Sequence, residues 1–293
     1  MEKAETEDDL GRQLDEIELQ GRMRRIGRKF LIMSGKGGVG KSTFAVNLAT
    51  ALVREGARVG LLDVDLHGPS IPGLLGLEGK RLRPDGCGEI RPLLTPEGLE
   101  VVSLGLILQG TGEAVIWRGP LKYKAIHQFL KDVAWGSLDY LVIDSPPGTG
   151  DEPLSIAQLA GPGTEAVLVT TPQERALDDV RRSVSFCRML HLPAAGIVEN
   201  MSGLVCPHCG VDIDLFKRGG GEKLAAETGV PFLGRIPLDE RIVDSGETGR
   251  PFVSAHPDGP PARALRAVIA ALTAKPAAAP EAGGASTTTE EQP

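Results

Sequence analysis

The chain has 293 residues, of which 41% are hydrophobic and 24% charged, so it can bury one substantial core and a single globular domain is expected. A formal net charge of -7 argues against a surface built to bind nucleic-acid phosphates. No stretch reaches the roughly 20 apolar residues of a membrane span, the acidic N-terminus is unlike a secretory signal, and four cysteines cannot form a disulfide framework in so long a chain. We therefore expect a cytoplasmic protein with no nucleic-acid and no membrane partner.

Both ends of the chain differ in composition from its centre. Residues 1–28 lack a sustained apolar period, and five of the eight residues from 22 to 29 are basic, which predicts a charged, solvated, partly helical arm. Residues 275–293 hold no large apolar side chain and are rich in Ala, Pro, Thr and Glu, which predicts a disordered tail. The folded domain is expected to span residues 29–274.

Short apolar runs alternate with longer helical patterns through this domain. Most of the runs are continuous, which is typical of strands that are buried on both faces of a parallel sheet. We expect an α/β fold with a doubly wound, mostly parallel sheet of about seven or eight strands flanked by helices. The predicted strands cover residues 30–33, 58–62, 99–104, 140–143, 166–170, 195–198 and 230–233.

The segment after the first predicted strand carries the strongest motif. It reads GKGGVGKST and precedes a helical pattern over residues 44–54, which is the strand–loop–helix context of a phosphate-binding loop. Its glycines let backbone amides wrap the phosphates, and the helix N-terminus adds partial positive charge. Lys41 should contact the β- and γ-phosphates and Ser42 should bind Mg²⁺. The expected nucleotide contacts are Gly35, Lys36, Gly37, Gly38, Val39, Gly40, Lys41, Ser42 and Thr43.

Acidic residues close two of the apolar runs. Asp144 ends the run over 140–143, as in a Walker-B strand, and is expected to face Mg²⁺ through a water molecule. Asp63 and Asp65 follow the run over 58–62. Either could face the nucleotide or be a solvated acid at a strand end.

Lys36 is a second lysine inside the phosphate-binding loop, where a simple P-loop needs only one. The KGGVGKS pattern resembles the deviant Walker-A ATPases, the class of MinD, ParA and nitrogenase iron protein. The resemblance implies an ATP-dependent, face-to-face dimer in which Lys36 reaches nucleotide phosphate across the interface. It also implies that Asp65 orients the attacking water.

Further stretches together look like the Mrp/ApbC branch of this class, whose members carry iron–sulfur clusters. The resemblance covers roughly residues 28–255. It implies that Asn200 and Pro237 read the adenine ring, for which a carboxamide is chemically suited. The sequence departs from the family pattern at Lys217, where a glycine that used a positive φ is expected, and at Ser145. The matching stretches are WRGPLK (117–122), LDYLVIDSPPGTGDEPLS (138–155), TTPQERALDDV (170–180), VENMSG (198–203) and CPHCG (206–210).

Cys206 and Cys209 form a C-x-x-C pair on a loop that contains Gly and Pro. Such a pair alone is ambiguous among a zinc knuckle, a redox dithiol and a cluster ligand. No second C-x-x-C occurs in the chain, but two chains related by a twofold axis would supply four thiolates, enough for one bridging [4Fe-4S] cluster. His208 is expected to be an exposed loop residue, Cys187 a buried thiol, and Cys87 to have no role.

The favoured hypothesis is an iron–sulfur cluster carrier that binds and slowly hydrolyses ATP, assembles a [4Fe-4S] cluster across a homodimer and transfers it to apoproteins. Its cofactors would be ATP, Mg²⁺ and the cluster. A partition or positioning ATPase of the MinD/ParA kind, a redox protein like nitrogenase iron protein and a zinc-binding scaffold are the alternatives. The expected catalytic residues are Lys36, Lys41 and Asp65, and the expected metal ligands are Cys206 and Cys209 for iron–sulfur and Ser42 and Asp144 for magnesium.

Overall fold

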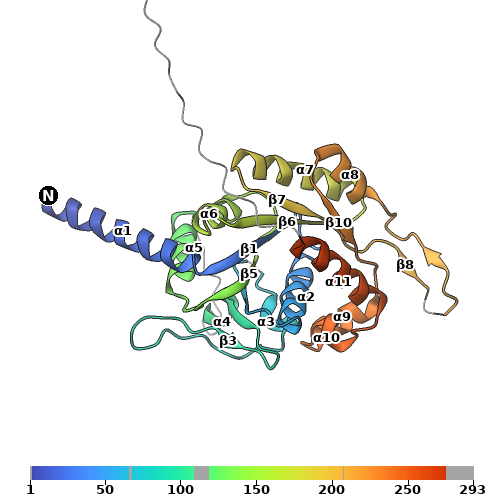
Figure 1. Ribbon diagram of the computed structural model, residues 1–293, viewed down its shortest axis with the longest axis horizontal. Coiled ribbons are helices and arrows are strands. Elements are labelled where there is room, and N and C mark those ends of the chain that lie inside the picture. The colour runs from blue at the N-terminus through green and yellow to red at the C-terminus, as the bar shows by residue number, and fades with distance from the viewer. Residues whose placement is uncertain (1, 66–67, 109–118, 207, 275–293) are drawn as a thin grey trace, which may run out of the picture.

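The computed structural model describes residues 2–65, 68–108, 119–206 and 208–274, and a sheet of eight strands forms its centre (Figure 1). The strands are β1 (Ile26–Met33), β2 (Val59–Asp63), β3 (Leu93–Leu94), β4 (Glu100–Ser103), β5 (Leu138–Asp144), β6 (Thr164–Thr170), β7 (Ala194–Glu199) and β10 (Phe232–Arg235). Their spatial order is β10-β7-β6-β1-β5-β2-β4-β3. Neighbours pair in parallel except β3 and β4, which are antiparallel. The predicted fold class is confirmed.

All seven predicted strands lie in this sheet, but β1 begins four residues earlier than expected. Charged residues concealed its start, because tertiary partners allow them to be buried there. Arg28 forms an ion pair with Glu165 of β6 at 2.6 Å, and the Lys29 ammonium donates to the carbonyl oxygen of Pro162 at 2.7 Å. Burial lowers the pKa of Lys29 to about 8. The edge strand β3 was not predicted, since two residues carry no periodic signal.

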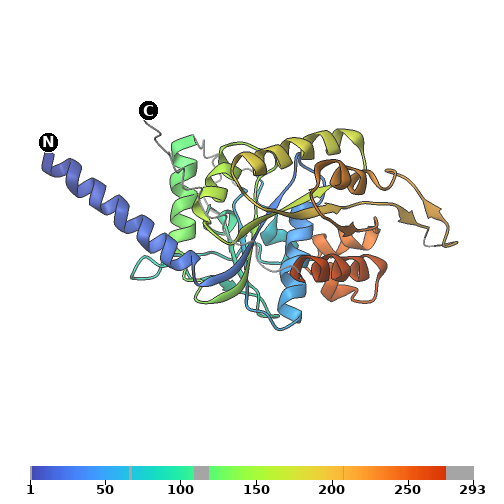
Figure 2. The same ribbon diagram turned by 45° about the horizontal axis from the view of Figure 1, so that its top comes forward.

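Helices cover both faces of the sheet (Figures 1 and 2). On one face α2 (Lys41–Arg54) packs against β2 and β5, and α11 (Pro260–Thr273) packs against β10. On that side lie also α3 (Ile71–Leu74), α9 (Glu240–Glu247) and α10 (Phe252–Ala255). The other layer contains α5 (Gly119–Asp132), α6 (Asp151–Leu159), α7 (Glu174–Met189) and α8 (Gly220–Thr228). The short α4 (Leu104–Leu108) follows β4.

The helix α1 (Glu2–Met23) projects from the body, and its last turns dock on the domain (Figure 1). Leu19 and Met23 are fully buried against the core. The expectation of a solvated arm is therefore wrong for these turns, because their apolar side chains are too few to give a visible period but still reach the core.

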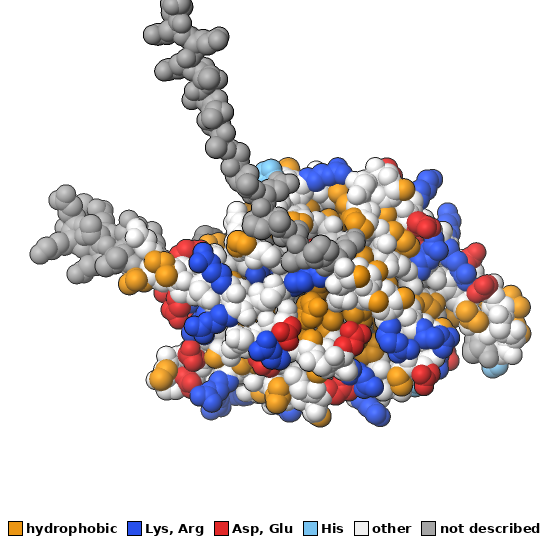
Figure 3. All heavy atoms as spheres, viewed as in Figure 1, with side chains coloured by type: hydrophobic (Ala, Val, Ile, Leu, Met, Phe, Trp, Pro, Cys, Tyr) orange, Lys and Arg blue, Asp and Glu red, His pale blue; other side chains and the backbone are white. Residues whose placement is uncertain are grey.

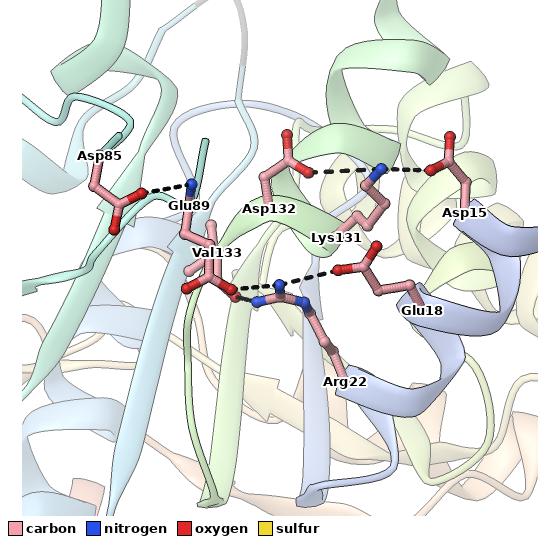
Figure 4. A network of polar contacts seen from close by, with 8 residues as sticks. All are labelled: Asp15, Glu18, Arg22, Asp85, Glu89, Lys131, Asp132 and Val133. Carbon is pink, nitrogen blue, oxygen red and sulfur yellow. Dashed lines mark hydrogen bonds and ion pairs between the residues drawn. The ribbon is translucent and has the colours of Figure 1, made fainter. Parts of the chain in front are cut away.

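Ionic contacts surround this docked end of α1 (Figure 4). Arg22 binds Glu89 at 2.7 Å and donates to the carbonyl oxygen of Val133. Lys131 of α5 binds Asp15 at 2.5 Å. Arg22, a basic residue near the end of the arm, thus has partners within the domain.

A two-stranded hairpin of β8 (Leu204–Val205) and β9 (Asp212–Ile213) projects on the side opposite α1 (Figure 1). The expected disordered tail, residues 275–293, lies outside the described residues, as do Trp117 and Arg118. In the described part of the chain, no helix is long and apolar enough to span a bilayer.

Candidate functional site

The phosphate-binding loop connects β1 to α2 and forms one wall of a cleft of about 280 Å³. Gly38 and Gly40 adopt positive φ angles of 79° and 85°, and Gly40 is the N-cap of α2. A Cβ at Gly40 would lie 2.2 Å from Nδ2 of Asn200 and would displace that side chain, and the positive φ also favours glycine there. A Cβ at Gly35 would lie 2.4 Å from the backbone of Asp179 in α7. The glycines thus set both the curvature of the loop and its close packing.

Lys41, which lines this cleft, forms a buried ion pair with Asp144. The Lys41 ammonium lies 2.6 Å from Oδ1 of Asp144 and 3.3 Å from Oγ of Ser42. Burial raises the pKa of Asp144, and the positive charge of Lys41 opposes that shift. Oδ2 of Asp144 is buried without a partner among the described residues. A buried carboxylate oxygen beside a hydroxyl is a donor set that suits Mg²⁺.

Asp63 lies beside Asp144 in the paired register of β2 and β5. Its side chain is fully buried, and it accepts hydrogen bonds from Oγ of Ser103 at 2.9 Å and from the backbone N–H of Asp65 at 3.1 Å. Burial, with the nearby Asp144 carboxylate, raises the pKa of Asp63 to about 7. Asp63 is therefore not a solvated acid at a strand end.

Substituting asparagine for Asp63 should stabilise the nucleotide-free and magnesium-free protein at pH 8. The folded-state pKa of about 7 exceeds the ordinary aspartate pKa of 3.8, which applies to the unfolded chain. Between these values the folded protein holds a proton that the unfolded chain has released, so the free energy of unfolding falls as pH rises from about 4 to 7. The Asp63→Asn variant should lose this slope and gain roughly 4 kcal/mol at pH 8, with little change at pH 4. Urea unfolding at both pH values measures the gain, and a wild-type stability that is constant from pH 4 to 7 would contradict it.

Asp65, Lys36 and Pro147 line the same cleft as the phosphate-binding loop. Pro147 belongs to the turn that follows Asp144. This turn is tied to β1 and to the start of the loop, because the Ser145 hydroxyl donates to the carbonyl oxygen of Ile32 at 2.9 Å and the Gly148 N–H donates to that of Ser34 at 2.8 Å. The unusual Ser145 therefore forms a buried hydrogen bond with β1.

A second, largely apolar pocket of about 410 Å³ continues from the phosphate cleft. The two hollows share Gly40 and Thr43 on their walls. Asn200 and Pro237 both line the second pocket, and Nδ2 of Asn200 donates to the carbonyl oxygen of Val39 at 2.9 Å. The structure thus brings the two residues expected to read adenine next to the phosphate-binding loop.

Cys206 and Cys209 lie at the turn of the hairpin formed by β8 and β9. Cys206 is half-buried and Cys209 is exposed, and the Cys206 N–H donates to the carbonyl oxygen of Val211 at 2.9 Å. Backbone N–H groups of Cys209 and His208, together with the Cys209 side chain, lower the pKa of Cys206. A thiolate, the form that binds metals, is therefore favoured at Cys206. His208 is exposed, as predicted.

The other two cysteines lie apart from this pair. Cys187 is buried in α7, as predicted, and burial raises its pKa to about 12. Cys87 is exposed in the loop whose Asp85 accepts from the Cys87 N–H at 2.9 Å.

The hairpin also presents apolar side chains to solvent, which gather at one end of the molecule (Figure 3). The exposed fractions are 45% for Val205, 60% for Val211, 40% for Ile213 and 58% for Leu215. Exposed apolar clusters of this kind mark contact surfaces for other proteins.

Lys217 has a φ of 69°, so the position where a glycine was expected does use the left-handed region. This conformation strains a residue that has a Cβ. Lys217→Gly should raise the free energy of unfolding by about 0.5–1 kcal/mol. Lys217→Ala keeps the Cβ and is the matched control, expected to give no such gain in urea unfolding. Equal gains for both variants would assign the effect to the lysine charge.

Glu199 is a buried residue of this region that the sequence analysis did not single out. It ends β7 directly before Asn200, and its side chain is completely inaccessible to solvent. The signal was available, since Asp144 was recognised as a carboxylate that closes an apolar strand.

Comparison with known proteins agrees with this geometry. A family model described as ParA: NUBPL iron-transfer P-loop NTPase matches residues 25–273. An iron–sulfur cluster carrier protein from Methanocaldococcus jannaschii is 50% identical over 238 residues, which are 81% of this chain and 82% of the relative. The cytosolic Fe-S cluster assembly factor NUBP2 from Bos taurus is 48% identical over 241 residues, 81% of this chain and 89% of the relative.

Solved structures show the same architecture. A nucleotide-binding protein from Archaeoglobus fulgidus in complex with ADP is 37% identical, with a TM-score of 0.72 over 84% of this chain and 94% of its own. The cell division ATPase MinD from Pyrococcus furiosus is 26% identical, with a TM-score of 0.61 over 85% of this chain and 99% of its own. The resemblance to deviant Walker-A ATPases and cluster carriers is confirmed, and this chain belongs to the ParA family of NUBPL-type iron-transfer P-loop NTPases.

Proposed function

We propose that this protein carries a [4Fe-4S] cluster between two copies of the chain and transfers it to apoproteins under the control of ATP. One observation carries the proposal: the cysteine hairpin adjoins the nucleotide pocket. Pro237 and Leu238 line the apolar pocket of about 410 Å³, which we call the base pocket because it would hold the adenine base. They also line a neighbouring groove of about 790 Å³, and Cys206 lines that groove too. The nucleotide and the cluster would therefore share a wall.

The ligand count supports a cluster that bridges two chains. The described residues of one chain contain no group of three or more His, Cys, Asp or Glu that could hold a metal ion. Cys206 and Cys209 from each of two copies would supply the four thiolates of a [4Fe-4S] cluster. The exposed apolar side chains of the hairpin offer contact area to a second copy.

The nucleotide chemistry is assigned to the residues of the phosphate cleft. Lys41 would bind the phosphates, while Ser42 and Asp144 would hold Mg²⁺, which neutralises phosphate charge when bound. Asp65 would orient the attacking water and Lys36 would contact the nucleotide of the partner. Hydrolysis by a single chain should be slow, because Lys36 and Asp65 act only when the dimer aligns them.

The clients and the compartment follow from the relatives. Proteins named as an iron–sulfur cluster carrier and a cytosolic Fe-S cluster assembly factor are 50% and 51% identical to this chain over the aligned 238 and 246 residues. We therefore assign apo iron–sulfur proteins as clients and the cytoplasm as the compartment.

Anaerobic reconstitution tests the proposal, with iron, sulfide and zinc measured per chain and the molecular mass measured in solution. We expect about four irons per dimer and a broad absorption band near roughly 400 nm. One zinc per dimer without iron would instead indicate a zinc-binding scaffold. A metal-free protein that dimerises with ATP would indicate a positioning ATPase of the MinD kind.

A further inference from the structure

The buried carboxylate of Glu199 holds both ends of the segment that carries the cysteines. On the incoming side, the hydroxyl of Ser202 donates to Oε1 just before β8 begins. On the outgoing side, the N–H groups of Gly219 and Gly221 donate to Oε1 and Oε2, the first at 2.9 Å. The hairpin therefore leaves the domain and returns to it at one side chain.

The glycines after the hairpin make this contact possible. Gly219 has a φ of 82° and is the N-cap of α8. A Cβ at Gly220 would lie 2.6 Å from the carbonyl oxygen of Pro172, and one at Gly221 would lie 3.1 Å from the Glu199 side chain. Larger residues would push the start of α8 away from Glu199. The helix dipole of α8 also favours the negative charge of Glu199 at the N-terminus of this helix.

The returning segment is joined to the hairpin itself through Arg218. Its guanidinium lies 2.9 Å from Asp212 in β9 and 2.6 Å from Asp214. The same side chain covers Gly203, where an added Cβ would lie 2.1 Å from Nε of Arg218. Arg218 thus links the residues held by Glu199 to the base of the hairpin.

The neighbouring residue contacts the nucleotide site. Asn200 donates to Val39 in the phosphate-binding loop, and the backbone around it pairs with the segment that contains Pro237. In that pairing, the Ile236 N–H donates to the carbonyl oxygen of Glu199 at 2.8 Å, and the Ser202 N–H donates to that of Ile236 at 2.9 Å. Two adjacent side chains therefore point to two different sites, Asn200 to the nucleotide loop and Glu199 to the cysteine hairpin.

We propose that Glu199 is the positioning residue through which nucleotide binding changes the conformation of the Cys206–Cys209 hairpin. The inference deepens the proposed function and rests on it for its purpose, which is to let ATP control the hold on the cluster. A nucleotide that moves Asn200 and the wall at Pro237 must move Glu199 with them, because the backbone is shared. Glu199 then shifts both ends of the hairpin together.

The test measures the alkylation of the cysteines in the metal-free protein with iodoacetamide, followed by mass spectrometry at each thiol. In the wild type, Mg-ATP should change the alkylation rates of Cys206 and Cys209 by about fivefold or more, the lower end of typical coupling between sites. Exposed Cys87 is the internal control, and its rate should not change. In Glu199→Gln the effect of Mg-ATP on Cys206 and Cys209 should disappear, while the Kd for ATP stays within about threefold of the wild type.

Glu222→Gln is the matched control. Both Glu222 and Glu199 contact Arg235, which lies 3.5 Å from Glu199, but the Glu222 side chain is exposed on the surface. It should keep the wild-type response. If Glu199→Gln fails to fold, Arg218→Ala decides, since this partly exposed residue is the next contact toward the hairpin and its loss should also weaken the response. A response that persists in the folded variant, or its absence in the wild type, would overturn the inference.

The readout contains no iron, so it separates two kinds of failure. If the wild type binds no cluster, but ATP changes its thiol reactivity and Glu199→Gln removes that change, the carrier proposal is refuted and the inference about Glu199 stands. A protein that binds four irons per dimer but shows no effect of ATP on the thiols would refute only the coupling.

Discussion

Replacing Cys206 and Cys209 together with alanine should remove the iron from the anaerobically reconstituted protein, from about four ions per dimer to near zero. Each chain would lose both of its thiolates, so the dimer would keep none of the four that a [4Fe-4S] cluster needs. The loss should appear both in iron and sulfide analysis and in the absorption band near roughly 400 nm.

Nucleotide binding should survive this double substitution. The apolar pocket that we propose binds the base is lined by Asn200, Pro237 and their neighbours, and neither cysteine lines it. The Kd for ADP should therefore change by less than about threefold, or under 1 kcal/mol. Cys87→Ala and His208→Ala are the matched controls, one an exposed cysteine outside the hairpin and the other between the two ligands, and both should retain iron. Full iron retention in the double variant would refute the ligand assignment.

The placement of the residues around the phosphate cleft could be predicted, because it follows the local order of the chain. The phosphate-binding loop needs a strand, glycines and a helix in succession, and Asp144 ends an apolar strand. Such features are set by neighbours in sequence. The same holds for Lys217, where the family pattern indicated a left-handed residue and the structure has a φ of 69°.

Features that depend on distant partners were less visible in the sequence. The beginning of β1 was missed, because Arg28 is stabilised there by Glu165, which is 137 positions away along the chain. Asp63 stayed ambiguous until β2 and β5 were seen to place it beside Asp144. Glu199 was not predicted, because its role is to accept hydrogen bonds from both ends of a loop. These ends, Ser202 and Gly219, are 17 residues apart. In each case a tertiary contact sets the role of a charged residue.

Lys41→Met should both abolish ATP hydrolysis and destabilise the fold. Under the proposed function, loss of the Lys41 charge removes electrostatic stabilisation of the transition state, which is worth about 10²-fold or more in rate. In the nucleotide-free protein it also leaves the fully buried Asp144 without the ammonium that lies 2.6 Å away. Breaking a buried pair in this way costs about 3–5 kcal/mol.

The two effects can be separated with the double variant Lys41→Met/Asp144→Asn. It carries no buried charge at this pair, so its free energy of unfolding should return to within about 1–2 kcal/mol of the wild type, whereas hydrolysis stays absent. Lys36→Met is the matched control: Lys36 is a half-buried lysine of the same loop, and its substitution should change stability by less than about 0.5 kcal/mol.

The pH dependence gives the decisive check on the Lys41–Asp144 pair. Without Lys41, burial and the charge of Asp65 both raise the pKa of Asp144, and only the Ser42 hydrogen bond opposes them. The carboxyl therefore binds a proton more readily in the folded state. Neutral Asp144 needs no partner charge, and the destabilisation of Lys41→Met should therefore shrink as pH falls. Urea unfolding of the single and double variants between pH 5 and 8 measures this change. If the loss of stability is independent of pH and persists in the double variant, it comes from lost packing around Lys41 and not from an unpaired buried carboxylate.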